Sequence, residues 1–185
     1  MSVLPIYTYG TPVLRKKAKP VEEADDEVIR LAMDMFETMH NANGIGLAAT
    51  QVGSLHRVVV VDLSELEDMK DMKPILLINP EVVTAEGACV QEEGCLSIPD
   101  VRDDVERAEQ IKVKFRNADF REVSMEVSGL LARVILHEID HLDGVLFIDR
   151  IPKEKRKAHA KALKQIQKND IEVSYPIVSA EALSV

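Results

Sequence analysis

The chain is organised around one apolar segment, LLARVILHEIDHL at residues 130–142. Its Leu, Ile and Val residues nearly encircle a helix, a pattern typical of a helix buried in the protein interior. His137 and His141 are one helical turn apart on one face, so both imidazoles can bind one metal ion. Glu138 lies beside them, where it can exchange protons with a water activated by the metal. Burying these polar groups is costly, and metal-dependent hydrolysis explains the pattern better than a helix with two solvated or internally bonded histidines.

Other features of the sequence indicate one ordinary globular domain. The chain has 185 residues, of which 46% are hydrophobic and 30% charged, and it has no internal repeat. The start, MSVLPIYTYG, does not resemble a secretory signal, and no apolar run is long enough to span a membrane. The two cysteines, Cys89 and Cys95, are therefore expected to be free thiols in a reducing, cytoplasmic compartment.

Sequence periodicity predicts an α+β fold, in which mixed or antiparallel strands pack around the central buried metal-binding helix, with helices near both ends of the chain. Loops are expected at the glycine-rich segment 44–53 and the irregular segment 92–99. We expect a catalytic domain at residues 1–169 and a C-terminal extension at 170–185, which contains a short strand and a loose tail. Helices are expected at 25–43, 129–142 and 152–169, and strands at 57–63, 75–84, 109–116 and 122–127.

The third metal ligand is not evident from the histidine helix alone. Catalytic zinc-type sites commonly use three protein ligands and a water. Phe147 occupies the position where one class of metallopeptidases has a third histidine, and the downstream candidates, Glu154 and Glu172, lie in unconvincing settings. Upstream, Cys95 follows a glycine, and a thiolate binds zinc and ferrous iron well.

Three motifs in the same order resemble the signatures of the peptide deformylases. They are the loop GIGLAATQ at residues 44–51, the loop EGCLS at residues 93–97 and the helix motif HEIDH at residues 137–141. The resemblance covers the chain from Leu4 to about Arg150. It implies an enzyme that removes the formyl group from the N-terminal formylmethionine of new polypeptides and releases formate.

The resemblance also implies roles for the site residues. Cys95, His137 and His141 would bind one divalent metal ion, most often Fe²⁺ in cells, with Zn²⁺, Ni²⁺ or Co²⁺ as substitutes. Glu138 would carry the proton from the water to the departing amine. The side-chain amide of Gln51 and the backbone N–H of Leu96 would stabilise the oxyanion, although Gln51 alone would also suit a cap of its own loop.

The resemblance assigns the substrate-binding residues less specifically than the metal ligands. By resemblance, Ile45 and Gly46 would pair with the substrate backbone, and Arg102 would lie near the far end of the substrate unless it forms a surface ion pair. The apolar Leu130 and Val134 face the same way as His137 and are candidates for the methionine pocket, or ordinary core residues. Arg133 is expected to reach the pocket rim. Asp140 is expected either to orient an imidazole or to be exposed.

Charge is unevenly distributed along the chain. The net charge is −9, but residues 150–168 contain eight Lys or Arg and one acid, giving +7, so the remainder carries −16. The simplest interpretation of this basic segment is a solvated helix face. Relatives with a basic C-terminal helix dock near the ribosomal exit tunnel, and a +7 helix is suited to ribosomal RNA. Neither DNA nor membrane binding is expected. A peptidase and a non-catalytic module that binds formylated termini are the rival functions.

Overall fold

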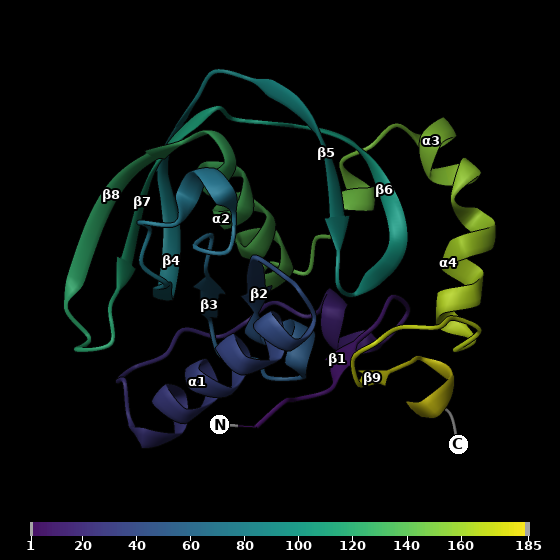
Figure 1. Cartoon of the computed structure of the whole chain (residues 1–185), viewed down its shortest axis with the longest axis horizontal. Coiled ribbons are helices and arrows are strands. Elements are labelled where there is room, and N and C mark those ends of the chain that lie inside the picture. The colour runs from purple at the N-terminus through teal and green to yellow at the C-terminus, as the bar shows by residue number, and fades with distance from the viewer. Residues whose placement is uncertain (1, 184–185) are drawn as a thin grey trace.

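The computed structural model describes residues 2–183 and has the predicted α+β architecture with antiparallel sheets (Figure 1). The helices are α1 (Asp26–Asn41), α2 (Gly129–Leu142), α3 (Lys153–Ala158) and α4 (Ala160–Gln167). The strands are β1 (Ile6–Tyr7), β2 (Gly46–Ala48), β3 (Val58–Val61), β4 (Ile75–Glu86), β5 (Cys89–Cys95), β6 (Ile98–Arg107), β7 (Gln110–Arg116), β8 (Glu122–Ser128) and β9 (Ile177–Val178).

A five-stranded sheet in the order β2-β3-β4-β7-β8 supports the two longer helices, and all of its strand pairs are antiparallel. Alternate side chains of β3 point to opposite faces of the sheet. Val58 and Val60 pack in the same cluster as α1, and Val59 and Val61 pack in the cluster that contains α2. The sheet therefore separates two cores, and β2 is left as an edge strand near α2.

Helix α2 carries the histidine motif and is the most buried helix of the described chain. It ends at Leu142, as predicted, two residues before Gly144. Gly144 has a φ of +74°, and a Cβ at this position would lie 2.7 Å from the carbonyl oxygen of Arg15. The N-terminal segment thus crosses the end of α2, and Ala18 donates a backbone hydrogen bond to the Leu142 carbonyl at 2.7 Å.

The expected loop at 92–99 is wrong for most of its length, because these residues belong to the β5–β6 hairpin. Strand β5 has the sequence CVQEEGC, with little of the apolar alternation that marks a strand. Three consecutive residues, Val90, Gln91 and Glu92, face solvent, and the one buried side chain of β5 is the charged Glu93. The register shifts between Gly94 and Cys95, so the hairpin is irregular at the cysteine.

Two further expectations need correction. The segment 44–53 is not a simple loop, because Gly46–Ala48 pairs with β3 and a 3-10 turn follows at Ala49–Val52. The single basic helix expected at 152–169 is two helices, α3 and α4, which meet at His159.

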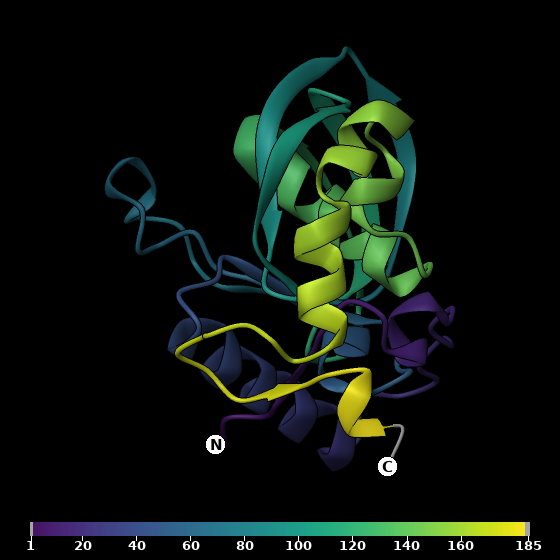
Figure 2. The same cartoon turned by 90° about the vertical axis from the view of Figure 1, so that its right-hand side faces the viewer.

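Short strands near the two ends of the chain pair with each other. The N-terminal β1 and the C-terminal β9 form a parallel pair, with Ile6 opposite Ile177 and Tyr7 opposite Val178. Figure 2 shows the chain after α4 turning back to reach this pairing. None of the helices within residues 2–183 combines the length and the apolar composition needed to cross a bilayer.

Candidate metal centre and substrate cleft

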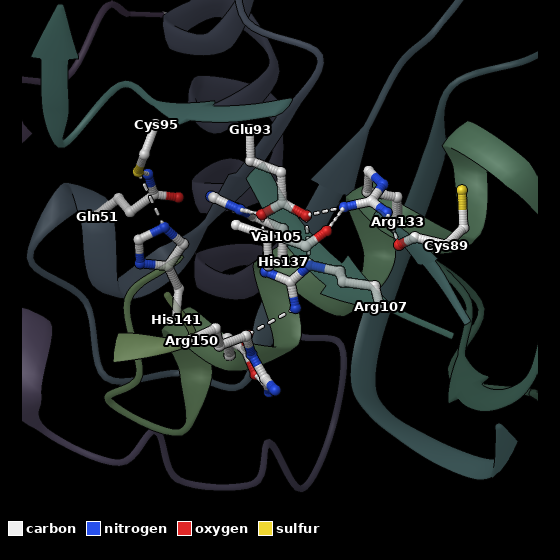
Figure 3. Close-up of polar contacts among 11 residues, drawn as sticks. Gln51, Cys89, Glu93, Cys95, Val105, Arg107, Arg133, His137, His141 and Arg150 are labelled. Atoms are coloured by element: carbon white, nitrogen blue, oxygen red, sulfur yellow. Dashed lines mark hydrogen bonds and ion pairs between the residues drawn. The ribbon is translucent and has the colours of Figure 1, made fainter. Parts of the chain in front are cut away.

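One thiol and two imidazoles converge between the β5–β6 hairpin and α2. The ligand atoms of Cys95, His137 and His141 all lie within 4.8 Å of one another. The Cys95 Sγ is 3.1 Å from the Nε2 of His141, as Figure 3 shows. The irregular register of the hairpin places the cysteine, and the one-turn spacing on α2 places both histidines. Glu154 and Glu172 do not belong to this group, and Phe147 is buried with its ring stacked on His137 at 6.4 Å.

These residues suit a divalent transition metal. A thiolate and two neutral imidazoles form a donor set that binds zinc-type and ferrous ions. Beside them, the Oε2 of Glu138 is buried without a hydrogen-bond partner among the described residues. A buried carboxylate oxygen with no partner is costly unless a ligand or water satisfies it. The donor set and the unpartnered oxygen both fit a metal ion with an adjacent water.

Glu93, which begins the EGCLS motif, holds His137 in place, a role that the sequence pattern did not predict. Its Oε2 accepts a hydrogen bond from the Nδ1 of His137 at 2.9 Å (Figure 3). Arg107 donates to both carboxylate oxygens, at 2.5 and 2.9 Å, and Arg133 donates to Oε1 at 2.7 Å. Burial opposes ionisation of Glu93, but the hydrogen bonds from His137 and Arg107 outweigh it and lower the pKa to about 2.

The predictions for Arg133 and Asp140 are wrong. Although Arg133 borders the cleft, its side chain is buried and donates to Glu93 and to the carbonyl oxygens of Val105 and Cys89, at 2.9 and 2.6 Å. A buried carboxylate and two carbonyl groups satisfy the guanidinium better than water at the rim. Asp140 neither orients an imidazole nor is exposed, because its buried carboxylate accepts from Arg107 at 2.8 Å and from Arg150.

His137, Glu138 and His141 on α2 differ in the direction of their pKa shifts. Burial raises the pKa of Glu138 to about 7 and lowers the pKa of His141. Burial also opposes protonation of His137, but hydrogen bonds with Cys95 and Glu93 outweigh this and raise its pKa to about 10 in the metal-free protein. A metal ion on the Nε2 of His137 would displace that proton, so metal binding releases protons.

Gln51 serves its own loop with one end of its amide and faces the cysteine turn with the other. Its Oε1 accepts from the backbone N–H of Ala48 at 2.8 Å. Its Nε2 donates to the Oγ of Ser97 at 3.2 Å and lies 3.6 Å from the Cys95 Sγ. The donor end of this buried amide is therefore directed at the metal centre. Leu96, next to Cys95, is half-buried.

A cleft of about 680 Å³ opens onto this centre, and all five residues expected to bind substrate line it. They are Ile45, Gly46, Leu130, Val134 and Arg102. A Cβ on Gly46 would lie 2.6 Å from the Oε1 of Glu138, so β2 approaches the carboxylate closely. Arg102 is exposed and lies 3.7 Å from Glu92, as expected of a surface ion pair. Cys89 lies away from Cys95 (Figure 3) and outside the metal-ligand group.

The C-terminal segment also forms part of the cleft, although its sequence did not predict such a role. The cleft is also lined by Glu172, Val173, Ser174 and Tyr175. Tyr175 donates a hydrogen bond to the carbonyl oxygen of Leu96 at 2.8 Å. No pattern within residues 171–185 signals this contact, because it depends on the pairing of β9 with β1.

Comparison with known proteins gives one consistent family. The family model described as polypeptide deformylase matches residues 3–157. A peptide deformylase from Chlorobium phaeovibrioides is 48% identical over 178 residues, which cover 96% of this chain and 94% of the relative, and one from Chlorobaculum parvum is 47% identical over 175 residues, which cover 95% and 94%. Among solved structures, peptide deformylases from Legionella pneumophila and Thermus thermophilus have TM-scores of 0.84 and 0.83 and are 37% and 44% identical. They cover 91% and 90% of this chain, which in turn covers 98% and 99% of theirs.

Proposed function

The chain belongs to the peptide deformylase family, and we propose which of its residues remove the formyl group from the N-terminal formylmethionine of new polypeptides. The observation that carries this proposal is the convergence of Cys95, His137 and His141 beside Glu138 at the base of one cleft. In our proposal these three ligands bind the metal ion. When bound, a divalent ion there supplies Lewis-acid activation of water and of the formyl carbonyl group.

Glu138 carries the proton in this proposal. Its pKa of about 7 allows it to accept a proton from the attacking water and to deliver it to the departing amine nitrogen near neutral pH. Its unpartnered Oε2 is free to receive that water. Because Glu138 lies outside the group of converging ligand atoms, we assign it to proton transfer and not to metal binding.

Two neutral donors stabilise the negative charge that develops on the formyl oxygen. We assign this role to the Nε2 of Gln51 and the backbone N–H of Leu96, which flank Cys95 from two different segments. Donors that are already in position cost little reorganisation as the oxyanion forms. The hydrogen bond from Ala48 to the Oε1 of Gln51 fixes which end of the amide faces the cleft.

The cleft holds the peptide in an extended conformation. We propose that the substrate backbone pairs with Ile45 and Gly46, because β2 is an edge strand at the cleft. Leu130 and Val134 supply apolar surface for the methionine side chain. The exposed Arg102 at the outer end contacts residues that follow the formylmethionine.

We propose Fe²⁺ as the cellular metal, with Zn²⁺, Ni²⁺ and Co²⁺ as functional substitutes, and the cytoplasm as the site of action. Cys/His/His ligation suits all four ions. Metal analysis of protein purified without oxygen tests the first point. We expect iron to dominate, and to be lost after purification in air, because a thiolate-bound ferrous site is sensitive to oxidation.

We also propose that the basic segment 150–168 docks on ribosomal RNA. Within it, Arg150, Lys155 and Arg156 are already paired with acids of this chain. An exposed stripe with helical spacing is formed by Lys157, Lys161, Lys164 and Lys168. Reversing these four charges should abolish salt-sensitive cosedimentation with ribosomes and leave the turnover of a free formylated tripeptide unchanged. Undiminished cosedimentation would refute docking through this stripe.

Formate release from formyl-Met-Ala-Ser tests the assigned chemistry. The wild-type protein should release formate and leave unformylated Met-Ala-Ser intact, whereas a peptidase would cleave the latter. Glu138→Gln should retain the metal and lose about 10²- to 10⁴-fold in kcat. Glu154→Gln, a change at an exposed position on α3, serves as the matched control. Unchanged turnover of Glu138→Gln would refute the proton-transfer role, and binding without turnover by the wild type would favour a binding module.

A further inference from the structure

The segment after α4 passes along the mouth of the cleft and is held at its far end. We define the C-terminal strap as residues 171–178. Glu172–Tyr175 lines the cleft, and Ile177–Val178 forms β9, which is paired with β1. Figure 2 shows the chain returning from α4 to this pairing. The strap is therefore part of the cleft wall.

Tyr175 makes a polar contact between the strap and the cysteine turn. Its hydroxyl donates to the Leu96 carbonyl oxygen at 2.8 Å, and its side chain is partly buried. Burial, with the nearby Cys95 and Asp100, raises the pKa of Tyr175 to about 12. The hydroxyl thus keeps its proton, and the hydrogen bond persists, throughout the neutral pH range.

A second contact fixes the next peptide group of the same turn. The backbone N–H of Tyr9 donates to the Ser97 carbonyl oxygen at 2.8 Å. The two ends of the chain, which pair with each other through β1 and β9, therefore hold two consecutive carbonyl groups after Cys95. The N–H and the carbonyl group of Leu96 belong to adjacent peptide planes that pivot about its Cα. Fixing the carbonyl plane restricts the direction in which the N–H points.

We propose that Tyr175 is a positioning residue for deformylation: its hydroxyl fixes the Leu96 carbonyl group and so aims the Leu96 N–H at the formyl oxygen. This inference rests on the proposed role of Leu96 as an oxyanion donor. Tyr175 acts through the turn and does not contact the reacting atoms. Its loss should therefore weaken transition-state stabilisation more than substrate binding.

Tyr175→Phe tests the inference because it removes the hydroxyl and keeps the ring. Tyr7→Phe is the matched control, because Tyr7 lies on β1, the strand that pairs with the strap, and its hydroxyl has no hydrogen bond within residues 2–183. Kinetics with formyl-Met-Ala-Ser should be normalised to the bound metal and measured well below the melting temperature. We expect Tyr175→Phe to lower kcat about 3- to 10-fold, with KM within about twofold of wild type and metal content unchanged.

The remaining outcomes separate this inference from the proposed function. Equal kcat values for Tyr175→Phe and Tyr7→Phe, with an active wild type, would overturn the positioning role and leave the deformylase assignment intact. A rise in KM at constant kcat would also overturn it, because that result indicates a strap that only contacts substrate. A wild-type protein that holds its metal but releases no formate would refute the proposed function itself.

Discussion

Replacing Glu93 by Gln should weaken both metal binding and folding. In the native site, Oε1 accepts from Arg107 and Arg133, and Oε2 accepts from Arg107 and His137. A glutamine amide has one oxygen and one NH₂ group. In either orientation, its NH₂ group faces two donors, so only half of the four hydrogen bonds can form.

The expected loss of folding stability depends on the hydrogen bond that Arg107 keeps in the variant. Removing one partner of a buried ion pair costs about 3–5 kcal/mol. Arg107 keeps its hydrogen bond to Asp140 at 2.8 Å, so we expect the lower end, about 3 kcal/mol. For a chain of this length, that loss corresponds to a fall in Tm of about 6–12 °C. Loss of the acceptor at the Nδ1 of His137 should weaken metal affinity about 10- to 100-fold.

Two measurements check this prediction. Metal affinity is measured by competition with a chelator, and stability by thermal unfolding of the metal-free protein, so that the two effects are separated. Glu106→Gln is the control, because Glu106 is exposed on the same hairpin. A Glu93→Gln variant that matches Glu106→Gln within threefold in metal affinity and within 2 °C in Tm would show that the buried network does not support the site.

Three further changes have defined outcomes. Gly46→Ala should lower kcat and cost about 1–3 kcal/mol of stability, because its Cβ would lie 2.6 Å from the Oε1 of Glu138; an unchanged kcat and Tm would contradict this close approach. Removing the metal with a chelator should lower Tm by about 8–16 °C relative to protein holding metal at a thousand times its dissociation constant, and scanning calorimetry that finds no difference would argue against a site formed on folding. A hydrogen bond from Lys155 lowers the pKa of Asp103 to about 2. A carboxyl group whose pKa is lowered by folding stabilises the fold at pH values above its unfolded pKa, and this stabilisation is lost as the pH falls toward its folded pKa of about 2. The Tm difference between wild type and Asp103→Asn should therefore be full at pH 6 and smaller at pH 3. An equal Tm difference at both pH values would contradict this sign.

The sequence was sufficient where the burial pattern is periodic. Helices α1 and α2 and the core strands β3 and β7 were predicted within a few residues, because their apolar residues recur at helical or strand spacing. The β5–β6 hairpin was not predicted, since Glu93 occupies the inward position where an apolar residue would signal a strand. Its burial depends on Arg107 and Arg133, which are 14 and 40 residues away in sequence.

The same long-range dependence explains the wrong placement of Arg133. An isolated arginine on an apolar helix is expected to extend toward solvent. The structure buries it because a carboxylate and two carbonyl oxygens converge on it from β5 and β6. Likewise, Tyr175 reaches Leu96 from a segment 79 residues later in the sequence, which is anchored by the pairing of β9 with β1. The sequence motifs identify the candidate metal ligands but not the residues that orient them.

The two buried carboxylates beside His137, Glu93 and Glu138, have pKa values that differ widely, and this difference suits them to different roles. Hydrogen bonds from His137 and Arg107 outweigh burial and keep Glu93 ionised, with a pKa of about 2, so it accepts the Nδ1 hydrogen of His137 at any physiological pH. That hydrogen bond leaves the Nε2 lone pair of a neutral imidazole for the metal. Within residues 2–183 no group donates a hydrogen bond to the Oε2 of Glu138, and burial raises the pKa of Glu138 to about 7. A permanently charged group can orient a ligand but cannot carry a proton, whereas a carboxyl group with a pKa near 7 suits the proton-transfer role proposed for Glu138. Both residues are glutamates, so the difference between their roles depends on their surroundings and not on the residue type.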